Sequence, residues 1–170
     1  YFKPFYNPKC TINIWGPSGS SRSLVARLTR YFSPPFFPVR FKELPATVNV
    51  MEINNSSFKI DYLEISSEYI CHPGATVGFR LKLDQAVMAY LPDHEPALGS
   101  AHFPDLNEWT SGYNIAKEAN LLFHDGQYTN AEYNRRIGWG HSSIEQAVKF
   151  AELSKVKKLV IVHHDPANTD

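Results

Sequence analysis

Histidines and carboxylates recur in this chain at the ends of expected strands and helices. The positions are His72, Asp93, His124, Asp125, His141, His163 and His164. Imidazole and carboxylate groups without thiolate partners suit zinc, manganese or iron in a hydrolytic site. Each position also has a simpler interpretation, because a lone histidine at a strand end is usually a hydrogen-bonding surface residue. Their joint occurrence favours a hydrolytic metal site over unrelated surface positions.

A predicted hairpin brings two of these residues together. TVGFRLKL alternates apolar and polar residues, Asp84-Gln85 is expected to turn, and AVMAYL returns. In such an antiparallel pair, residues whose numbers sum to about 169 face each other. His72 precedes the hairpin and Asp93 follows it, so both should emerge at the same end of the sheet.

The adjacent histidines His163 and His164 follow the apolar run LVIV. Side chains alternate between the two faces of a strand, so one of the two is expected to face a site and the other to face away. A turn at Asp165-Pro166 would be the way to bring His164 close as well. His141 lies immediately before an expected helix, where anions bind at the N-terminus.

The elements that must position these residues alternate along the chain. A strand is expected over 11–16 and a helix in SSRSLVARLTRYF, with Leu24, Leu28, Tyr31 and Phe32 on one face. The proline- and aromatic-rich segment 31–45 should be irregular. VNVMEI and FKIDYLEIS alternate like strands and predict a hairpin that turns at 54–56.

Farther along, short strands alternate with capped helices. LLF and KKLVIVHH are expected strands, and Thr129 with Glu132 forms a capping-box pattern. A second box is expected at Ser142 with Glu145. The apolar stripe of the helix behind it comprises Ile144, Ala147, Val148 and Ala151.

Composition sets the outer limits. The 170 residues suffice for a single domain over 1–170, and 17 basic residues balance 17 acidic ones, so no net field favours nucleic acid or a membrane. Apolar runs fall far short of the roughly 20 residues that span a bilayer. Two cysteines without CxxC spacing fit a reducing compartment, so a cytoplasmic location is expected.

Four motifs carry a resemblance to a family. They are HPGATVGFRL, AYLPDHEP, LLFHDGQYTNAEY…GWGHSSIEQAVKFAE and VKKLVIVHHDP. In order and spacing they resemble the metallo-β-lactamase-fold hydrolases, and within them the ribonuclease Z and phosphodiesterase-like branch. The match extends from Cys71 onward, and residues 1–70 match more loosely. The resemblance implies an α/β fold, a four-layer αββα sandwich with mixed β-sheets.

The resemblance also assigns roles. It implies that His72 and His163 are metal ligands and that Asp93 bridges two divalent ions, with zinc first and manganese or iron as alternatives. His141 resembles the histidine that meets the phosphate or the leaving group. His124 and Asp125 resemble the catalytic loop, where Asp125 would orient a histidine.

One departure is large. The family's HxHxDH motif, which supplies most ligands of the first metal, has no counterpart in this sequence. We therefore expect a segment of a longer protein, truncated at both ends, in which the metal site is incomplete and activity is low.

The resulting functional hypothesis is a phosphodiesterase in which water is activated by two metal ions. Thioester, lactone or other ester hydrolysis on the same fold is the first alternative, and a non-catalytic binding or regulatory module is the second. The neutral charge and the lack of a basic arm favour a small substrate such as a cyclic nucleotide over nucleic acid. An apolar sheet face left uncovered by truncation would promote self-association, so the oligomeric state stays open.

Overall fold

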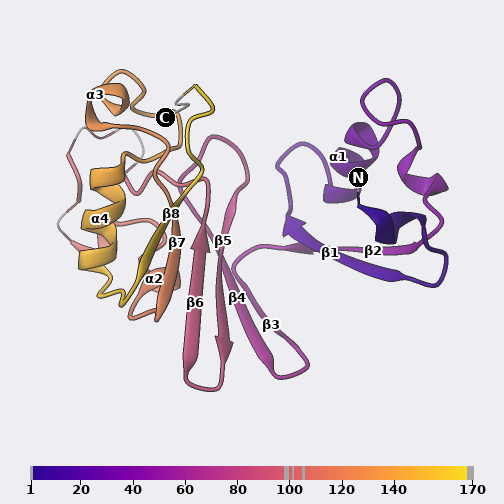
Figure 1. The fold of residues 1–170 in the computed structure, drawn as a ribbon, viewed down its shortest axis with the longest axis horizontal. Helices are drawn as coiled ribbons and strands as arrows, with labels where there is room; N and C mark the ends of the chain where they lie inside the picture. The colour runs from indigo at the N-terminus through magenta and orange to yellow at the C-terminus, as the bar shows by residue number, and fades with distance from the viewer. Residues whose placement is uncertain (1, 98–99, 101, 105, 168–170) are drawn as a thin grey trace. The chain divides into compact units, whose positions relative to one another are not determined.

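The computed structural model describes residues 2–97, 100, 102–104 and 106–167. The chain forms two compact units, Tyr1–Asn54 and Asn55–Asp170, which are described separately (Figure 1). The expectation of a single domain over 1–170 stays a prediction.

The first unit is built on two parallel strands. β1 (Thr11–Pro17) pairs with β2 (Thr47–Ile53) over its whole length, from Thr11 opposite Thr47 to Pro17 opposite Ile53. The helix α1 (Leu24–Tyr31) connects them, and the Ser23 hydroxyl caps it by accepting a hydrogen bond from the Ala26 N–H at 3.2 Å. The expected strand and helix are both present. Tyr31, expected on the apolar face of the helix, is 69% exposed.

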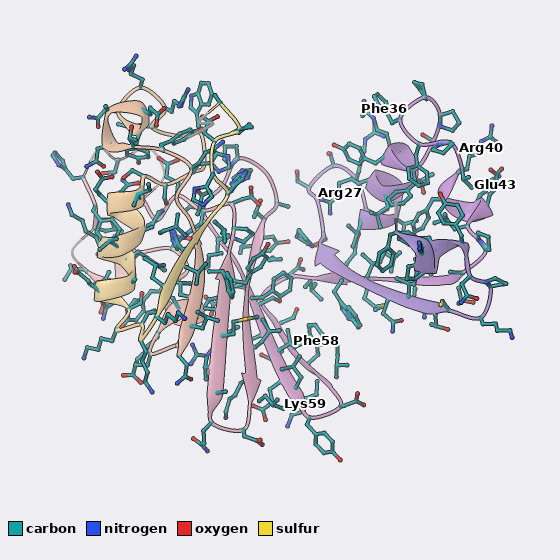
Figure 2. All side chains as sticks on the ribbon, viewed as in Figure 1. Arg27, Phe36, Arg40, Glu43, Phe58 and Lys59 are labelled. Atoms are coloured by element: carbon teal, nitrogen blue, oxygen red, sulfur yellow. The ribbon has the colours of Figure 1, made fainter. Side chains whose placement is uncertain are left out.

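Half-buried aromatic rings pack against one another in the first unit. Phe32 packs against Phe5, Phe37 and Phe41 at centroid distances of 5.5, 4.8 and 5.6 Å. Between the end of α1 and residue 45 the chain forms the short 3₁₀ helix η2 (Phe41–Glu43), at whose start the Arg40 N–H donates to the Glu43 carboxylate (Figure 2). Another 3₁₀ turn, η1 (Lys3–Tyr6), precedes β1.

The first predicted hairpin is wrong. β2 pairs with β1 rather than with the strand after it, and FKIDYLEIS contains two strands, β3 (Ser56–Ile60) and β4 (Leu63–Tyr69). The chain turns at Asp61, whose φ of 52° is tolerated by aspartate better than by most residues. Phe58 then faces Ile65, and Lys59 pairs with Glu64 at 2.8 Å (Figure 2). Alternation showed that these residues form strands, but it carries no information on which strand pairs with which.

The second predicted hairpin is confirmed, including its register. β5 (Val77–Leu83) and β6 (Ala86–Leu91) are antiparallel, with Leu83 opposite Ala86 and Phe79 opposite Tyr90. They stand in the middle of a six-stranded mixed sheet of order β3-β4-β5-β6-β7-β8. The α/β class with mixed sheets is therefore confirmed.

The far side of this sheet is parallel. β7 (Leu121–Asp125) pairs with β6, and β8 (Leu159–Val162) pairs with β7, both in parallel (Figure 1). Leu91 lies opposite His124, and Asp125 lies opposite Val162. The carboxyl ends of β6, β7 and β8 therefore share one edge of the sheet, together with the start of β5.

The helices of the second unit are short. They are α2 (Tyr113–Ala116), α3 (Asn130–Tyr133), α4 (Ile144–Leu153) and the 3₁₀ helix η3 (Asn107–Trp109). The capping box at Thr129 and Glu132 is confirmed. The box expected at Ser142 is formed one residue later, by Ser143 and Gln146, because the Ser142 hydroxyl instead donates to the His94 carbonyl at 2.6 Å.

The later start of α4 also changes its buried face. Ile144 and Val148, expected in the apolar stripe, are each 42% exposed, whereas Ala147 and Phe150 are fully buried. α2 and α4 pack on the sheet over a core formed by Ile70, Ala89, Leu91, Ile115, Ala116, Ala119, Leu122, Phe150 and Ala151. Among the described residues, no helix has the length and apolar character to cross a bilayer.

Candidate metal centre

Four neighbouring strands deliver ligand-type side chains to one edge of the sheet. His72 precedes β5, Asp93 follows β6, Asp125 ends β7 and His163 follows β8. The parallel register places the ends of β6, β7 and β8 together. Residues far apart in sequence are thus brought together by strand pairing, as the hairpin argument predicted for His72 and Asp93.

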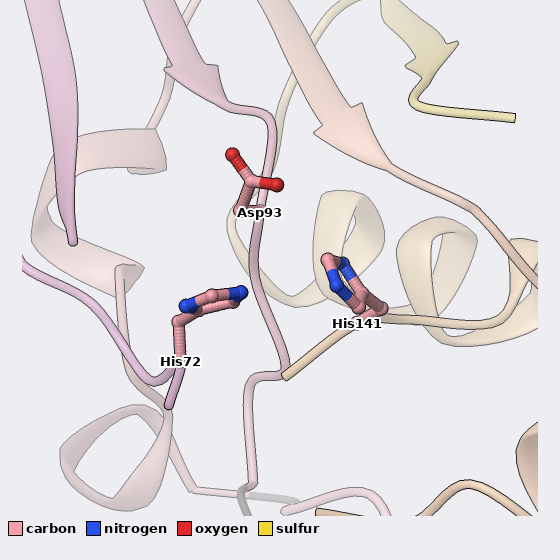
Figure 3. A group of neighbouring side chains, drawn as sticks. All are labelled: His72, Asp93 and His141. Atoms are coloured by element: carbon pink, nitrogen blue, oxygen red, sulfur yellow. The ribbon is translucent and has the colours of Figure 1, made fainter. Parts of the chain in front are cut away.

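The first group of side chains consists of His72, Asp93 and His141. One potential ligand atom from each residue lies within 4.8 Å of the others (Figure 3). The rings of His72 and His141 are edge to face, with centroids 5.2 Å apart. All three side chains are partly exposed, so an ion and a substrate would have access to them.

The second group consists of Asp125, His141 and His163, again with ligand atoms within 4.8 Å of one another. Nδ1 of His141 lies 2.7 Å from Asp125 Oδ2. Nδ1 of His163 lies 3.3 Å from the same oxygen and 3.4 Å from Asp93 Oδ1. His141 belongs to both groups, so the two groups form one continuous cluster.

Asp125 organises the loops around this cluster. Its carboxylate is fully buried and accepts hydrogen bonds from the backbone N–H groups of His94 (3.2 Å), Gln127 (3.0 Å) and Ser142 (3.2 Å). These donors come from the segments that follow β6, β7 and α3. A single side chain therefore fixes the loops that carry Asp93 and His141.

The two histidines of the first group have opposite pKa shifts. Burial lowers the pKa of His72, and the nearby His141 lowers it further. Burial alone would also lower the pKa of His141, but the hydrogen bond and charge of Asp125, with Asp93 and Glu95 nearby, raise it overall. The lowered pKa favours the neutral form of His72, whereas the raised pKa lets His141 retain a proton more readily.

His124 lies in neither ligand group of the described residues. It is fully buried, and its Nδ1 donates to the Asp125 carbonyl at 2.7 Å. Because a carbonyl only accepts, the neutral ring has an unprotonated Nε2, which accepts from His94 Nδ1 at 2.9 Å. Burial lowers the pKa of His124 to about 4 and that of His94 well below its usual value. The pair forms a neutral polar contact against Phe150.

Glu95 was not singled out from the sequence. It is fully buried, and its Oε1 accepts from Gly138 N–H at 2.9 Å and Tyr133 O–H at 2.7 Å, while Oε2 accepts from Gly140 N–H at 2.8 Å. Burial and this carboxylate raise the pKa of Tyr133 to about 12. Its position two residues after Asp93 was the one feature of the sequence that could have pointed to Glu95. Its hydrogen bonds to a glycine-rich loop 43 to 45 residues away could not be predicted from the sequence.

The structure separates the two adjacent histidines. His163 has a φ of 60°, a left-handed conformation that turns the chain directly after β8. The ring of His163 lies in the cluster, whereas His164, like His163 an exposed residue, belongs to neither ligand group of the described residues. The catalytic and ligand roles of His72, Asp93, His124, Asp125, His141 and His163 remain predictions.

Gly140 offers a test of how closely its loop packs on the cluster. A Cβ built there would lie 2.2 Å from Pro73 Cδ and 2.6 Å from His72 Cδ2, and φ is +91°. Gly138 has a similar φ of +85° but nothing within 4 Å of such a Cβ. We expect Gly138→Ala to lower the free energy of unfolding by about 1 kcal/mol through backbone strain alone.

Gly140→Ala should lower it by about 3 kcal/mol and perturb the His72 NMR signals, because strain and overpacking act together. Urea unfolding and histidine-resolved NMR spectra would measure both effects. Equal losses in the two variants would contradict the packing of this loop on His72.

The fold is that of a known class of α/β proteins. Residues 6–164 match the sequence profile of the beta-lactamase superfamily domain, and the chain belongs to this family. It is 24% identical over 196 residues to ribonuclease Z from Prochlorococcus marinus (strain MIT 9312), a match that covers 93% of this chain and 62% of that protein. The resemblance inferred from the four motifs is thereby confirmed.

Solved structures agree on the fold. Human tRNase Z, short form, matches with a TM-score of 0.67 at 20% identity, covering 94% of this chain and 62% of that one. A diphosphatase from the PhnP family matches with a TM-score of 0.61 at 16% identity, covering 96% and 53%. Proteins of this fold generally bind divalent metal ions such as zinc. The chain spans about 62% of the length of the ribonuclease Z relative.

Proposed function

We propose that the whole protein is a metal-dependent hydrolase that cleaves phosphodiesters. The observation that carries the proposal is the convergence of His72, Asp93, Asp125, His141 and His163 on one sheet edge, with ligand atoms of each group within 4.8 Å. The likeness to ribonuclease Z and to a PhnP-family diphosphatase supports phosphorus chemistry over carboxylic esters.

The donor set fits divalent metal ions. Imidazole nitrogens and carboxylate oxygens without thiolate suit zinc, with manganese and iron as alternatives. We propose His72, Asp93 and His163 as ligands, with Asp93 shared between two ions. Bound ions would supply Lewis acidity, lowering the pKa of a water and neutralising charge that builds on phosphorus.

His141 would act on the substrate in this proposal. An Asp125 oxygen can only accept, so the hydrogen between them lies on His141 Nδ1, which fixes the orientation of the ring. The raised pKa favours the protonated ring, whose other nitrogen would then donate to a phosphoryl oxygen or to the leaving oxygen. Asp125 would act by positioning His141.

Metal analysis and hydrolysis of bis-p-nitrophenyl phosphate by the whole protein would test the proposal. We expect Asp93→Ala to abolish turnover, by about 10³-fold or more, because it removes the group assigned to both ions. His164→Ala is the matched control: this histidine is adjacent to His163 but lies outside both ligand groups of the described residues, and much of the activity should remain. Absence of bound metal, with no activity restored by zinc or manganese, would refute the proposal.

A comparison of substrates would resolve the reaction further. Balanced charge, 17 basic and 17 acidic residues, favours a small phosphodiester over a long nucleic acid. The whole protein should hydrolyse cyclic nucleotides faster than it processes a tRNA precursor or cleaves an acyl thioester. Faster thioester cleavage would assign the site to ester hydrolysis instead.

A further inference from the structure

Trp139 is a large apolar side chain that remains at the surface of the second unit. Trp139 is 60% exposed and lies in the loop between α3 and α4. A single exposed hydrophobic residue is common on protein surfaces and does not by itself indicate a function. Here, however, the backbone on both sides of it is fixed by an unusual set of contacts.

Three consecutive backbone N–H groups are hydrogen-bonded around this tryptophan. Gly138 and Gly140 donate to the two different oxygens of Glu95, at 2.9 and 2.8 Å, and Trp139 itself donates to the Arg136 carbonyl at 3.0 Å. Glu95 is fully buried, and a buried carboxylate is costly unless it is fully paired. The loop is thus held rigidly while the indole at its centre is left exposed.

The same loop borders the candidate metal centre. Gly140 lies so close to His72 that a Cβ would approach the ring to 2.6 Å, and His141, the next residue, belongs to both ligand groups. Trp139 therefore precedes Gly140, whose backbone packs against His72, and lies two residues before His141 in the chain. An exposed indole on a backbone that is held in place in this way is suited to stacking on a flat ring of the substrate, because little backbone entropy is lost on binding.

We propose that Trp139 is the stacking platform for the nucleobase of a nucleotide phosphodiester whose phosphate is bound at the His72, Asp93 and His141 cluster. This inference rests on the proposed function and names its substrate class. Stacking needs no base-specific hydrogen bonds, so the platform accepts all bases. Glu95 serves as a positioning residue that presents Trp139.

The test compares ligands that differ only in the base. Calorimetry on the whole protein with zinc present would measure affinity for AMP and for ribose 5-phosphate. Trp139→Ala should weaken AMP binding at least fivefold, the lower end of the range for loss of base stacking, and leave ribose 5-phosphate binding unchanged. Trp139→Phe should restore most of the loss. Trp109→Ala is the control, since Trp109 is 75% exposed but lies in η3, outside this loop.

The result is distinguishable from failure of the proposed function. If the protein hydrolyses no phosphodiester, the hydrolase proposal fails, while the difference between AMP and ribose 5-phosphate still reports on stacking. Equal losses for both ligands in Trp139→Ala, or no loss for either, would overturn the platform. A change of oligomeric state in Trp139→Ala without a change in AMP affinity would also overturn the platform, because it would show that Trp139 contacts another protein chain.

Discussion

Asp125→Ala is expected to lower the free energy of unfolding by on the order of 3–5 kcal/mol and to disorder the loop that carries His141. The change leaves three backbone N–H groups, those of His94, Gln127 and Ser142, without their acceptor in a buried region. Each such loss costs about 1–3 kcal/mol, and the His141 ring loses its partner as well. Urea denaturation followed by circular dichroism would measure the change.

Asp93→Ala provides the matched control within the same cluster. The Asp93 side chain is 42% exposed, and its Oδ1 lies 3.4 Å from Nδ1 of His163. This variant should lose metal binding and activity but lower the free energy of unfolding by less than about 1 kcal/mol. Similar stability losses in the two variants would contradict the distinction between a structural carboxylate and a ligand carboxylate.

Acidification is expected to destabilise the metal-free chain because of its buried histidine pair. Burial lowers the pKa of His124 from an ordinary 6.5 to about 4, and that of His94 well below its usual value. Below pH 6.5 the unfolded chain binds protons that the folded chain excludes. The stability linked to His124 is therefore complete above about pH 6.5 and is lost progressively toward pH 4, by on the order of 3 kcal/mol.

Unfolding experiments between pH 7.5 and 4.5 would measure this loss. His102→Asn, at an exposed position outside the pair, is the control variant. Nitrogen-15 NMR shifts of the imidazoles at pH 5.5 should show His94 and His124 neutral. Protonation of His94 and His124 with midpoints near 6.5 would show that the pair is accessible to water, and this account would then be wrong.

Local sequence patterns predicted those parts of the site that depend on neighbouring residues. The turn at Asp84-Gln85 fixes the register of β5 and β6 and hence the shared end of the sheet for His72 and Asp93. The capping box at Thr129 was equally readable. Both features depend on contacts between residues within a few positions of each other or across a two-residue turn.

Features set by distant partners could not be predicted in this way. The parallel pairing of β1 with β2 joins residues 36 positions apart, and the strand pattern of VNVMEI is compatible with either neighbour. The sequence around Glu95 is typical of a polar turn, and only the folded chain brings Gly138 and Gly140 against its carboxylate. The left-handed φ of His163 likewise has no signature in its residue type. Long-range packing determines each of these.

The position of β8 at the end of the six-stranded order has a consequence for local unfolding. Asp93 follows β6 and Asp125 ends β7, and both strands are paired on both sides. His163 follows a four-residue strand that, among the described residues, is paired only with β7. Edge segments with few paired groups open most easily. Fraying of β8 would therefore carry away one imidazole of the cluster and leave both carboxylates in place. The lifetime of the complete cluster is then set by the opening of its outermost strand rather than by global unfolding.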